Sequence, residues 1–209
     1  MEYSFHIYNK LAADGVAMAT DRLLQADEKR KTVGAGISSP IKNDEFLGNK
    51  PPVVVCIGSD LAIGDSLGPI TGSMLKYKTQ GLNVFLYGTL AAPVTAKEIK
   101  YMRTFLKETH PRAQVIAVDA AVGNEGDIGL IKIHDSPLLP GAGANKKLGA
   151  IGDLSIMGIV AEKSIANYGL LNTTRLNLVY TMSEIISDAL SSMLWERCSR
   201  QKQNAQKNA

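Results

Sequence analysis

The stretch VVVCIGSDLAIGDSLGP, residues 53–69, decides the fold class of this chain. It begins with a continuous apolar run rich in β-branched residues, VVVCI (53–57), which is typical of a strand buried on both faces. A glycine-rich turn follows at 58–65, and a helical pattern runs from about Ser66 to Lys78. A buried strand that leads through a turn into a helix is the repeating unit of a parallel α/β sheet.

The same alternation of strand and helix patterns continues along the chain. We therefore predict an α/β fold, a three-layer α/β/α sandwich with a mostly parallel central sheet. The segment 128–133 shows partial alternation and is expected nearer an edge. The predicted strands are 53–57, 84–88, 114–120, 128–133 and 174–181, and the predicted helices are 11–31, 66–78, 96–109, a helix within 152–169, and 183–198.

The length and composition indicate one domain. The chain has 209 residues, of which 45% are hydrophobic, enough for a single core. Residues 1–50 are expected to form an N-terminal helix and a connecting loop packed on the domain, although a removable extension is the alternative. Residues 51–199 form the α/β domain, and 200–209 are expected to be a disordered tail because they hold no apolar anchor.

Charge and motif content argue against several classes of function. A formal net charge of +3, with no basic face carrying aromatic residues, gives no reason to expect a nucleic-acid partner. The two cysteines have no C-x-x-C spacing, and no motif predicts a cofactor. The first residues do not form a signal peptide, and no apolar run approaches the roughly 20 residues that cross a membrane, so the cytoplasm is the expected compartment.

Two aspartates are expected at the carboxyl ends of strands, where open parallel sheets form their sites. Asp65 lies in the first strand-to-helix connection, and Asp119 ends the apolar run VIAVD (115–119). Two close carboxylates push their pKa values apart, so one can act as an acid and the other as a base. We expect the two carboxyl groups about 3–6 Å apart in one cleft, with at least one raised pKa. Two structural alternatives stay open: Asp65 could cap the following helix, and Asp119 could cap a turn.

The residues around Asp65 resemble a known motif. GSDLAIGDSLGP (58–69) is similar to the first glycine-rich motif of the germination protease that degrades small acid-soluble spore proteins. The match covers Asp65, Leu67, Gly68 and Pro69, with Gly58 at the same spacing before the aspartate. AVDA (117–120) is similar to that family's second motif. From the early helix through the final helix the chain resembles the YyaC family, whose members are predicted to be sporulation proteases, and more distantly the hydrogenase maturation proteases.

The resemblance implies a function and a set of site residues. It implies a fold like that of the hydrogenase maturation proteases and the phosphorylase/hydrolase-like domains. Asp65 and Asp119 match the two essential aspartates of the germination protease, which implies an aspartic-type, sporulation-associated peptidase with a peptide or protein substrate, in the cytoplasm of the forespore or spore. The loop GAGANKKLG (141–149) resembles a glycine-rich loop of that protease, although an ordinary surface loop is the alternative. The candidate substrate contacts are Gly58, Ser59, Asp60, Gly141, Gly143, Asn145 and Lys146.

The histidines decide against a metal at this site. In the maturation proteases a histidine from a later loop completes a metal site, but the corresponding loop near Ala144 to Lys147 holds none. His134 is the one remaining candidate ligand, and two carboxylates alone bind a transition metal poorly, so we predict no metal. Two alternatives remain: a non-catalytic peptide-binding module and a metal-dependent maturation-type peptidase. The germination protease is considerably longer than this chain, so the resemblance supports the fold more strongly than the activity.

Overall fold

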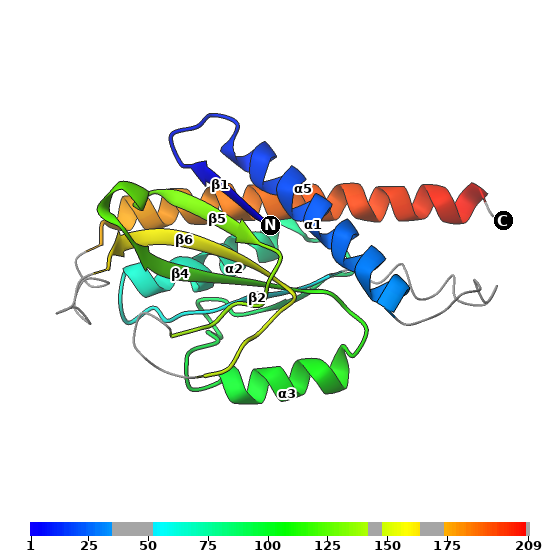
Figure 1. The fold of residues 1–209 in the computed structure, drawn as a ribbon, viewed down its shortest axis with the longest axis horizontal. Helices are drawn as coiled ribbons and strands as arrows, with labels where there is room; N and C mark the ends of the chain where they lie inside the picture. The colour runs from blue at the N-terminus through cyan, green and yellow to red at the C-terminus, as the bar shows by residue number, and fades with distance from the viewer. Residues whose placement is uncertain (35–51, 142–147, 164–173, 208–209) are drawn as a thin grey trace.

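The computed structural model describes residues 1–34, 52–141, 148–163 and 174–207, and in these residues six strands form one sheet in the order β1-β5-β6-β4-β2-β3 (Figure 1). Strands β6, β4, β2 and β3 are parallel neighbours, whereas β5 is antiparallel to both β1 and β6. The sheet is therefore mostly parallel, as predicted. The strands are β1 (Glu2–His6), β2 (Val53–Cys56), β3 (Phe85–Tyr87), β4 (Val115–Gly123), β5 (Leu130–His134) and β6 (Leu154–Glu162).

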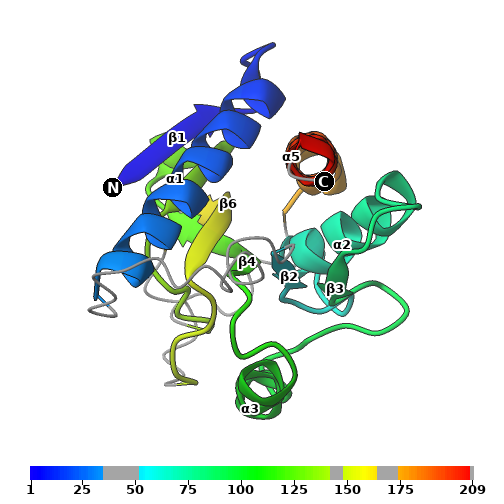
Figure 2. The ribbon, with the colours of Figure 1, turned by 90° about the vertical axis from the view of Figure 1, so that its right-hand side faces the viewer.

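Helices cover both faces of this sheet, which confirms the predicted α/β/α layers (Figure 2). Of the helices in the described residues, α1 (Ala12–Gly34), α2 (Leu67–Lys78) and α5 (Leu176–Lys207) lie on one face, and α3 (Ile99–Thr109) lies on the other. Two short 3-10 helices, η2 (Gly64–Ser66) and η3 (Glu125–Asp127), follow β2 and β4.

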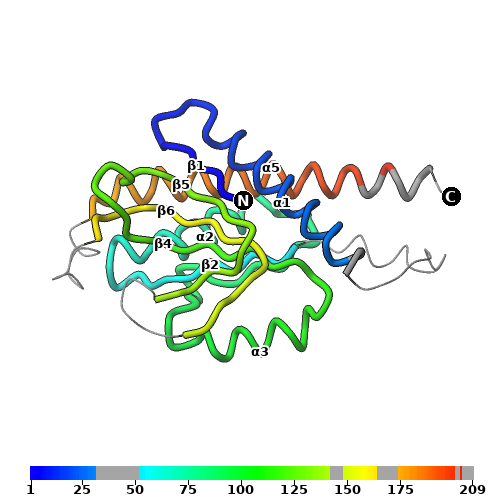
Figure 3. Tube along the Cα trace, viewed as in Figure 1, coloured from blue at the N-terminus to red at the C-terminus, as the bar shows by residue number. Residues whose placement is uncertain are grey.

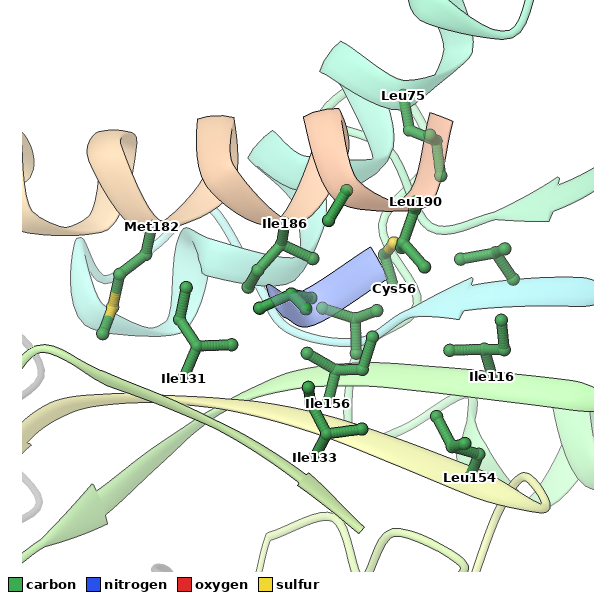
Figure 4. Close-up of a cluster of buried hydrophobic side chains, with 14 of the residues drawn as sticks. Cys56, Leu75, Ile116, Ile131, Ile133, Leu154, Ile156, Met182, Ile186 and Leu190 are labelled. Carbon is green, nitrogen blue, oxygen red and sulfur yellow. The ribbon is translucent and has the colours of Figure 1, made fainter. Parts of the chain in front are cut away.

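The apolar run of β2 is continuous because the strand is buried from both sides. Val54 and Cys56 belong to the larger core cluster beneath α1, α2 and α5, and Figure 4 shows Cys56 among the buried side chains of that cluster. Val53 and Val55 belong to the second cluster, against α3. Successive side chains of a strand point to opposite faces, so one strand contributes to both clusters.

Two predicted elements are wrong. Residues 154–161 were expected to form a helix, but they form β6, which is buried along most of its length between β4 and β5. Residues 174–181 were expected to form a strand, but α5 begins at Leu176. The β-branched and aromatic residues of this segment favour a strand. The helix is explained by four fully buried side chains at helical spacing, Val179, Met182, Ile186 and Leu190.

Other boundaries also differ. α5 continues to Lys207, beyond the boundary expected at residue 199, and the disorder expected of the tail stays a prediction. β1 is absent from the predicted elements because its alternation is weak, and it pairs with β5. α1 packs against α5 over the sheet, where Val16 and Leu24 are fully buried (Figure 3). The connection expected at 34–52 lies almost entirely outside the described residues.

Candidate functional site

The order of the strands creates a switch point between β2 and β4. After β2 the chain crosses through α2 to β3, whereas after β4 it continues to β5 and β6 on the opposite side of the sheet. The connections that leave the carboxyl ends of β2 and β4 therefore diverge. In open α/β sheets, ligands bind in the crevice that such a divergence leaves.

The turn after β2 positions Asp65 beside this point. The backbone N–H of Gly58 donates to the carbonyl of Val94 at 3.0 Å, and the N–H of Ser59 donates to the carbonyl of Asp65 at 3.1 Å. Gly58 has a φ of +139°, and a Cβ there would lie 2.0 Å from the Asp65 carbonyl oxygen. The turn can close this tightly because residue 58 is glycine.

Asp65 lies in η2, immediately before α2. Ser66, rather than Asp65, occupies the N-cap position of α2, and the Ser66 hydroxyl donates to the carbonyl of Ile63 at 2.6 Å. The half-buried Asp65 therefore does not hold the cap position that the structural alternative gave it. Its place at the N-terminal end of α2 favours a negative charge, because the helix dipole is positive there.

Asp119 lies inside β4 rather than at its end. It pairs in register with Met157 of β6, and β4 continues to Gly123, so the expected strand end and the turn-capping role are both wrong. The last pair between β2 and β4 joins Cys56 to Val118. Asp119 is thus the first β4 residue beyond β2, and only 8% of it is exposed.

The environment of Asp119 favours its protonated form. Burial raises the pKa of Asp119 well above its ordinary value, and the negative charge of Asp65 raises it further. The N–H of Ala120, which donates to Asp119 Oδ1 at 2.8 Å, opposes this shift only in part. This direction agrees with the expectation that one member of the pair has a raised pKa. The charge of Asp65 thus acts on Asp119, so the two aspartates belong to one candidate site.

The other candidate residues divide into three groups. Gly58, Ser59 and Asp60 lie in the turn that carries Asp65, and Asp60 is exposed. Gly141 has a φ of +72° and follows Leu138, which bridges to Ile151 beside α3. Gly143, Asn145 and Lys146 lie outside the described residues.

Two apolar side chains beside Asp65 were missed by sequence reasoning. Leu61 is 91% exposed and Ile63 is 38% exposed, both on the turn that follows β2. The signal was present in the sequence, because the turn is otherwise glycine-rich and polar but includes the run LAI (61–63).

His134 does not join the aspartates. It lies on β5 opposite Ser155 of β6, so two inter-strand spacings, about 10 Å, separate it from β4. Its Nδ1 lies 3.7 Å from the carboxylate of Glu2. Among the described residues, no group of three or more His, Cys, Asp or Glu side chains is arranged to hold a metal ion.

Neither Asp65 nor Asp119 lines either of two cavities that lie among the described residues. One lies beside β3, and the other lies beside the C-terminal end of α3. The predicted cleft between the two carboxyl groups therefore stays a prediction.

The fold and the site together define a doubly wound α/β domain with two carboxyl groups at its switch point. Residues 24–189 match the model of a family described as "Protein of unknown function (DUF1256)", and the chain belongs to this family. It is 45% identical over 142 residues to a Bacillus subtilis (strain 168) protein named "Uncharacterized protein YyaC", a match that covers 68% of this chain and 69% of that protein. The predicted relation to YyaC is confirmed.

A solved structure also resembles the chain. It is a nickel–iron hydrogenase maturation protease, HycI, from Thermococcus kodakarensis KOD1, with 19% sequence identity and a TM-score of 0.36. The match covers 70% of this chain and 99% of that protein. Similarity this low supports no inference about activity. Among the described helices, none has the length and apolar character that a membrane span needs.

Proposed function

We propose that this chain is a peptidase of aspartic type that uses Asp65 and Asp119 to hydrolyse a peptide bond. The observation that carries the proposal is the placement of both carboxyl groups at the switch point, with the pKa of Asp119 raised by burial and by Asp65. Structural ion pairs normally join opposite charges, whereas this pair joins two acids. Such an arrangement is typical of groups that exchange a proton during a reaction.

The two environments suggest a role for each residue. Asp65, at the N-terminal end of α2, accepts a proton from a water molecule as the water oxygen attacks the peptide carbonyl carbon. Asp119, which holds its proton, donates it to the peptide nitrogen as the carbon–nitrogen bond breaks. The proton taken up by Asp65 then passes to Asp119, directly or through water, and both groups regain their starting states.

The proposed substrate is a peptide or protein in the developing spore. The resemblance of the DSLGP unit (65–69) to the germination protease and the relation to YyaC support this setting. A deletion of the gene for YyaC in Bacillus subtilis, complemented by this chain or by its Asp119→Asn variant, tests it. The spore peptides found by mass spectrometry should differ between the two complemented strains.

The catalytic proposal predicts loss of cleavage when either carboxyl group is replaced. Asp65→Asn and Asp119→Asn keep the size of the side chain but cannot transfer the proton, so the cleavage rate should fall by a factor of about 10² or more. The measurement is mass spectrometry of new peptide termini after incubation with a mixture of unfolded proteins. Asp14→Asn is the matched control, because Asp14 is exposed on α1, belongs to no candidate site and should leave the rate unchanged.

The same assay separates the competing functions. Cleavage that a chelator abolishes would favour a metal-dependent peptidase. Cleavage that survives in both Asn variants would exclude the aspartate pair. If the wild-type protein cleaves nothing between about pH 4 and pH 8, where an acid–base pair of this kind should work, the chain is a binding module instead.

A further inference from the structure

A cavity of 610 Å³ lies along β3, and neither Asp65 nor Asp119 lines it. Its walls come from three parts of the chain: the end of α2 with the turn that follows it, the loop after β3, and the first half of α3. The strand itself forms the floor. The residues used below are Lys76, Leu86, Tyr87, Ala92, Glu98 and Met102.

β3 is the last strand of the sheet, and among the described residues it pairs with β2 alone. Edge strands carry unpaired N–H and C=O groups, and proteins usually protect them with charges, prolines or a covering segment. β3 consists of Phe85, Leu86 and Tyr87, with no charge and no proline, and Phe85 is 42% exposed. In the part of the chain that the structure describes, these three residues make no backbone hydrogen bond outside their pairing with β2, so the outer edge of β3 has room for hydrogen bonds to another extended chain.

The position of the helices restricts what can reach this edge. α2 and α3 lie on opposite faces of the sheet (Figure 2), and both line the cavity beside β3, which we call the groove. A further strand would fit about 4.8 Å from β3. Because residues of α2 and α3 flank this edge, we expect a flexible extended segment to reach it more easily than the β3 of a second folded copy. Such a segment lies outside a folded domain and can reach the edge of β3.

The charges at the two rims specify this segment further. Lys76 lies on the α2 side, and Glu98 lies on the α3 side, where the N–H of Thr95 holds its carboxylate at 3.0 Å. Alternate side chains of a strand point to opposite faces. A segment that places acidic side chains toward α2 and basic side chains toward α3 would match both rims. Leu86 and Met102 offer apolar contacts to its other side chains.

We infer that this groove binds an extended polypeptide segment, which adds to the sheet as a strand next to β3. The loop that borders the groove joins the turn of the candidate active site, because Gly58 donates to Val94 at 3.0 Å. A segment that leaves the groove along this loop approaches Asp65. The groove would thus hold a protein substrate for the peptidase proposed above, although the docking itself does not depend on cleavage.

The test is a titration of the full chain, followed by NMR of its backbone amides. The probe is the acetylated and amidated peptide Val-Thr-Glu-Lys-Val-Thr-Val, used at up to about 1 mM, where weak strand addition is still detected. The amide signals of Phe85, Leu86 and Tyr87 should shift in a saturable manner. The same peptide methylated on every backbone nitrogen should produce no shifts, because it cannot donate hydrogen bonds to the strand edge.

Two variants provide the matched comparison. Ala92→Trp fills the groove and should weaken binding at least tenfold, whereas Ala91→Trp, on an exposed neighbour that does not line the groove, should leave it unchanged. No shift at β3 up to the highest concentration, or shifts that the methylated peptide reproduces, would overturn the inference. A dimer that forms through β3, detected by sedimentation and abolished by Ala92→Trp, would also overturn it. Asp119→Asn should bind the peptide normally, so loss of cleavage and loss of docking are separate results.

Discussion

At the scale of single residues, the unusual group is Asp119. A carboxyl group that is buried and faces a second carboxylate destabilises the fold when it ionises. Evolution tolerates such a group most readily where it serves the reaction rather than the fold. Asp60, by contrast, is an exposed aspartate on the turn that follows β2.

Asp119 therefore predicts a dependence of stability on pH. The pKa of Asp119 is raised in the folded state, so its favourable contribution is present below the unfolded pKa and is lost as pH rises through the folded value. Asp119→Asn removes this dependence. The free energy of unfolding of Asp119→Asn in urea, minus that of wild type, should be larger at about pH 8 than at about pH 4.

The control for this experiment is Asp60→Asn, which should differ little from wild type at either pH because Asp60 is exposed. If Asp119→Asn shows the same difference from wild type at both pH values, Asp119 does not hold a raised pKa. That result would also remove the basis for its role as the acid.

At the scale of elements, the contact between β2 and α2 depends on glycine. A Cβ at Gly68 would lie 2.0 Å from the carbonyl oxygen of Ile57, so α2 begins almost in contact with the end of β2. The Ser183 hydroxyl of α5 donates to the carbonyl of Leu67 at 3.1 Å and holds the same turn from the other side. These contacts place Asp65 at the switch point.

This contact reverses the usual effect of a helical glycine. Alanine is favoured over glycine in a helix by about 1 kcal/mol, yet Gly68→Ala should destabilise the protein by about 1–3 kcal/mol, because the backbone of β2 cannot yield easily. The matched control is Gly126→Ala, since nothing lies within 4 Å of a Cβ at that position. The measurement is the free energy of unfolding of the two variants in urea. Equal stabilities would mean that α2 can move away from β2 at little cost.

At the scale of the whole molecule, the first elements of the chain belong to the main core. α1 contributes fully buried side chains to the cluster beneath α5, and Arg197 of α5 bonds to Asp21 of α1 at 2.7 Å. At the other end of α1, Lys31 lies 2.7 Å from Asp153, which precedes β6. α1 is thus fixed to two distant parts of the domain.

The integration of α1 predicts a large effect from one core residue. Leu24→Ala should lower the free energy of unfolding by about 2–5 kcal/mol, because Leu24 is fully buried and the change leaves a cavity. Met18→Ala is the control, since Met18 lies on the same helix and is 74% exposed. The measurement is the free energy of unfolding of both variants and of wild type in denaturant. A small loss for Leu24→Ala would favour the earlier alternative, that the N-terminal segment is a removable extension.

The sequence by itself determined the elements with local signals. The run VVVCI followed by a glycine-rich turn indicates β2 and α2, and the apolar stripe of 11–31 indicates α1, because side-chain periodicity within one element is visible in its own residues. The two aspartates also stood out, since a carboxylate that follows an apolar run is costly to bury without a purpose.

The tertiary structure alone decided the rest. A strand buried on both faces loses its alternation, so LSIMGIVA (154–161) reads equally well as a helix, and only its position between β4 and β5 makes it β6. The start of α5 is set by its packing over the sheet rather than by the β-forming residues near Val179. The raised pKa of Asp119 and the groove at β3 arise from segments far apart in the chain. Burial and the proximity of charges arise only in the folded chain, so the local sequence pattern cannot predict them.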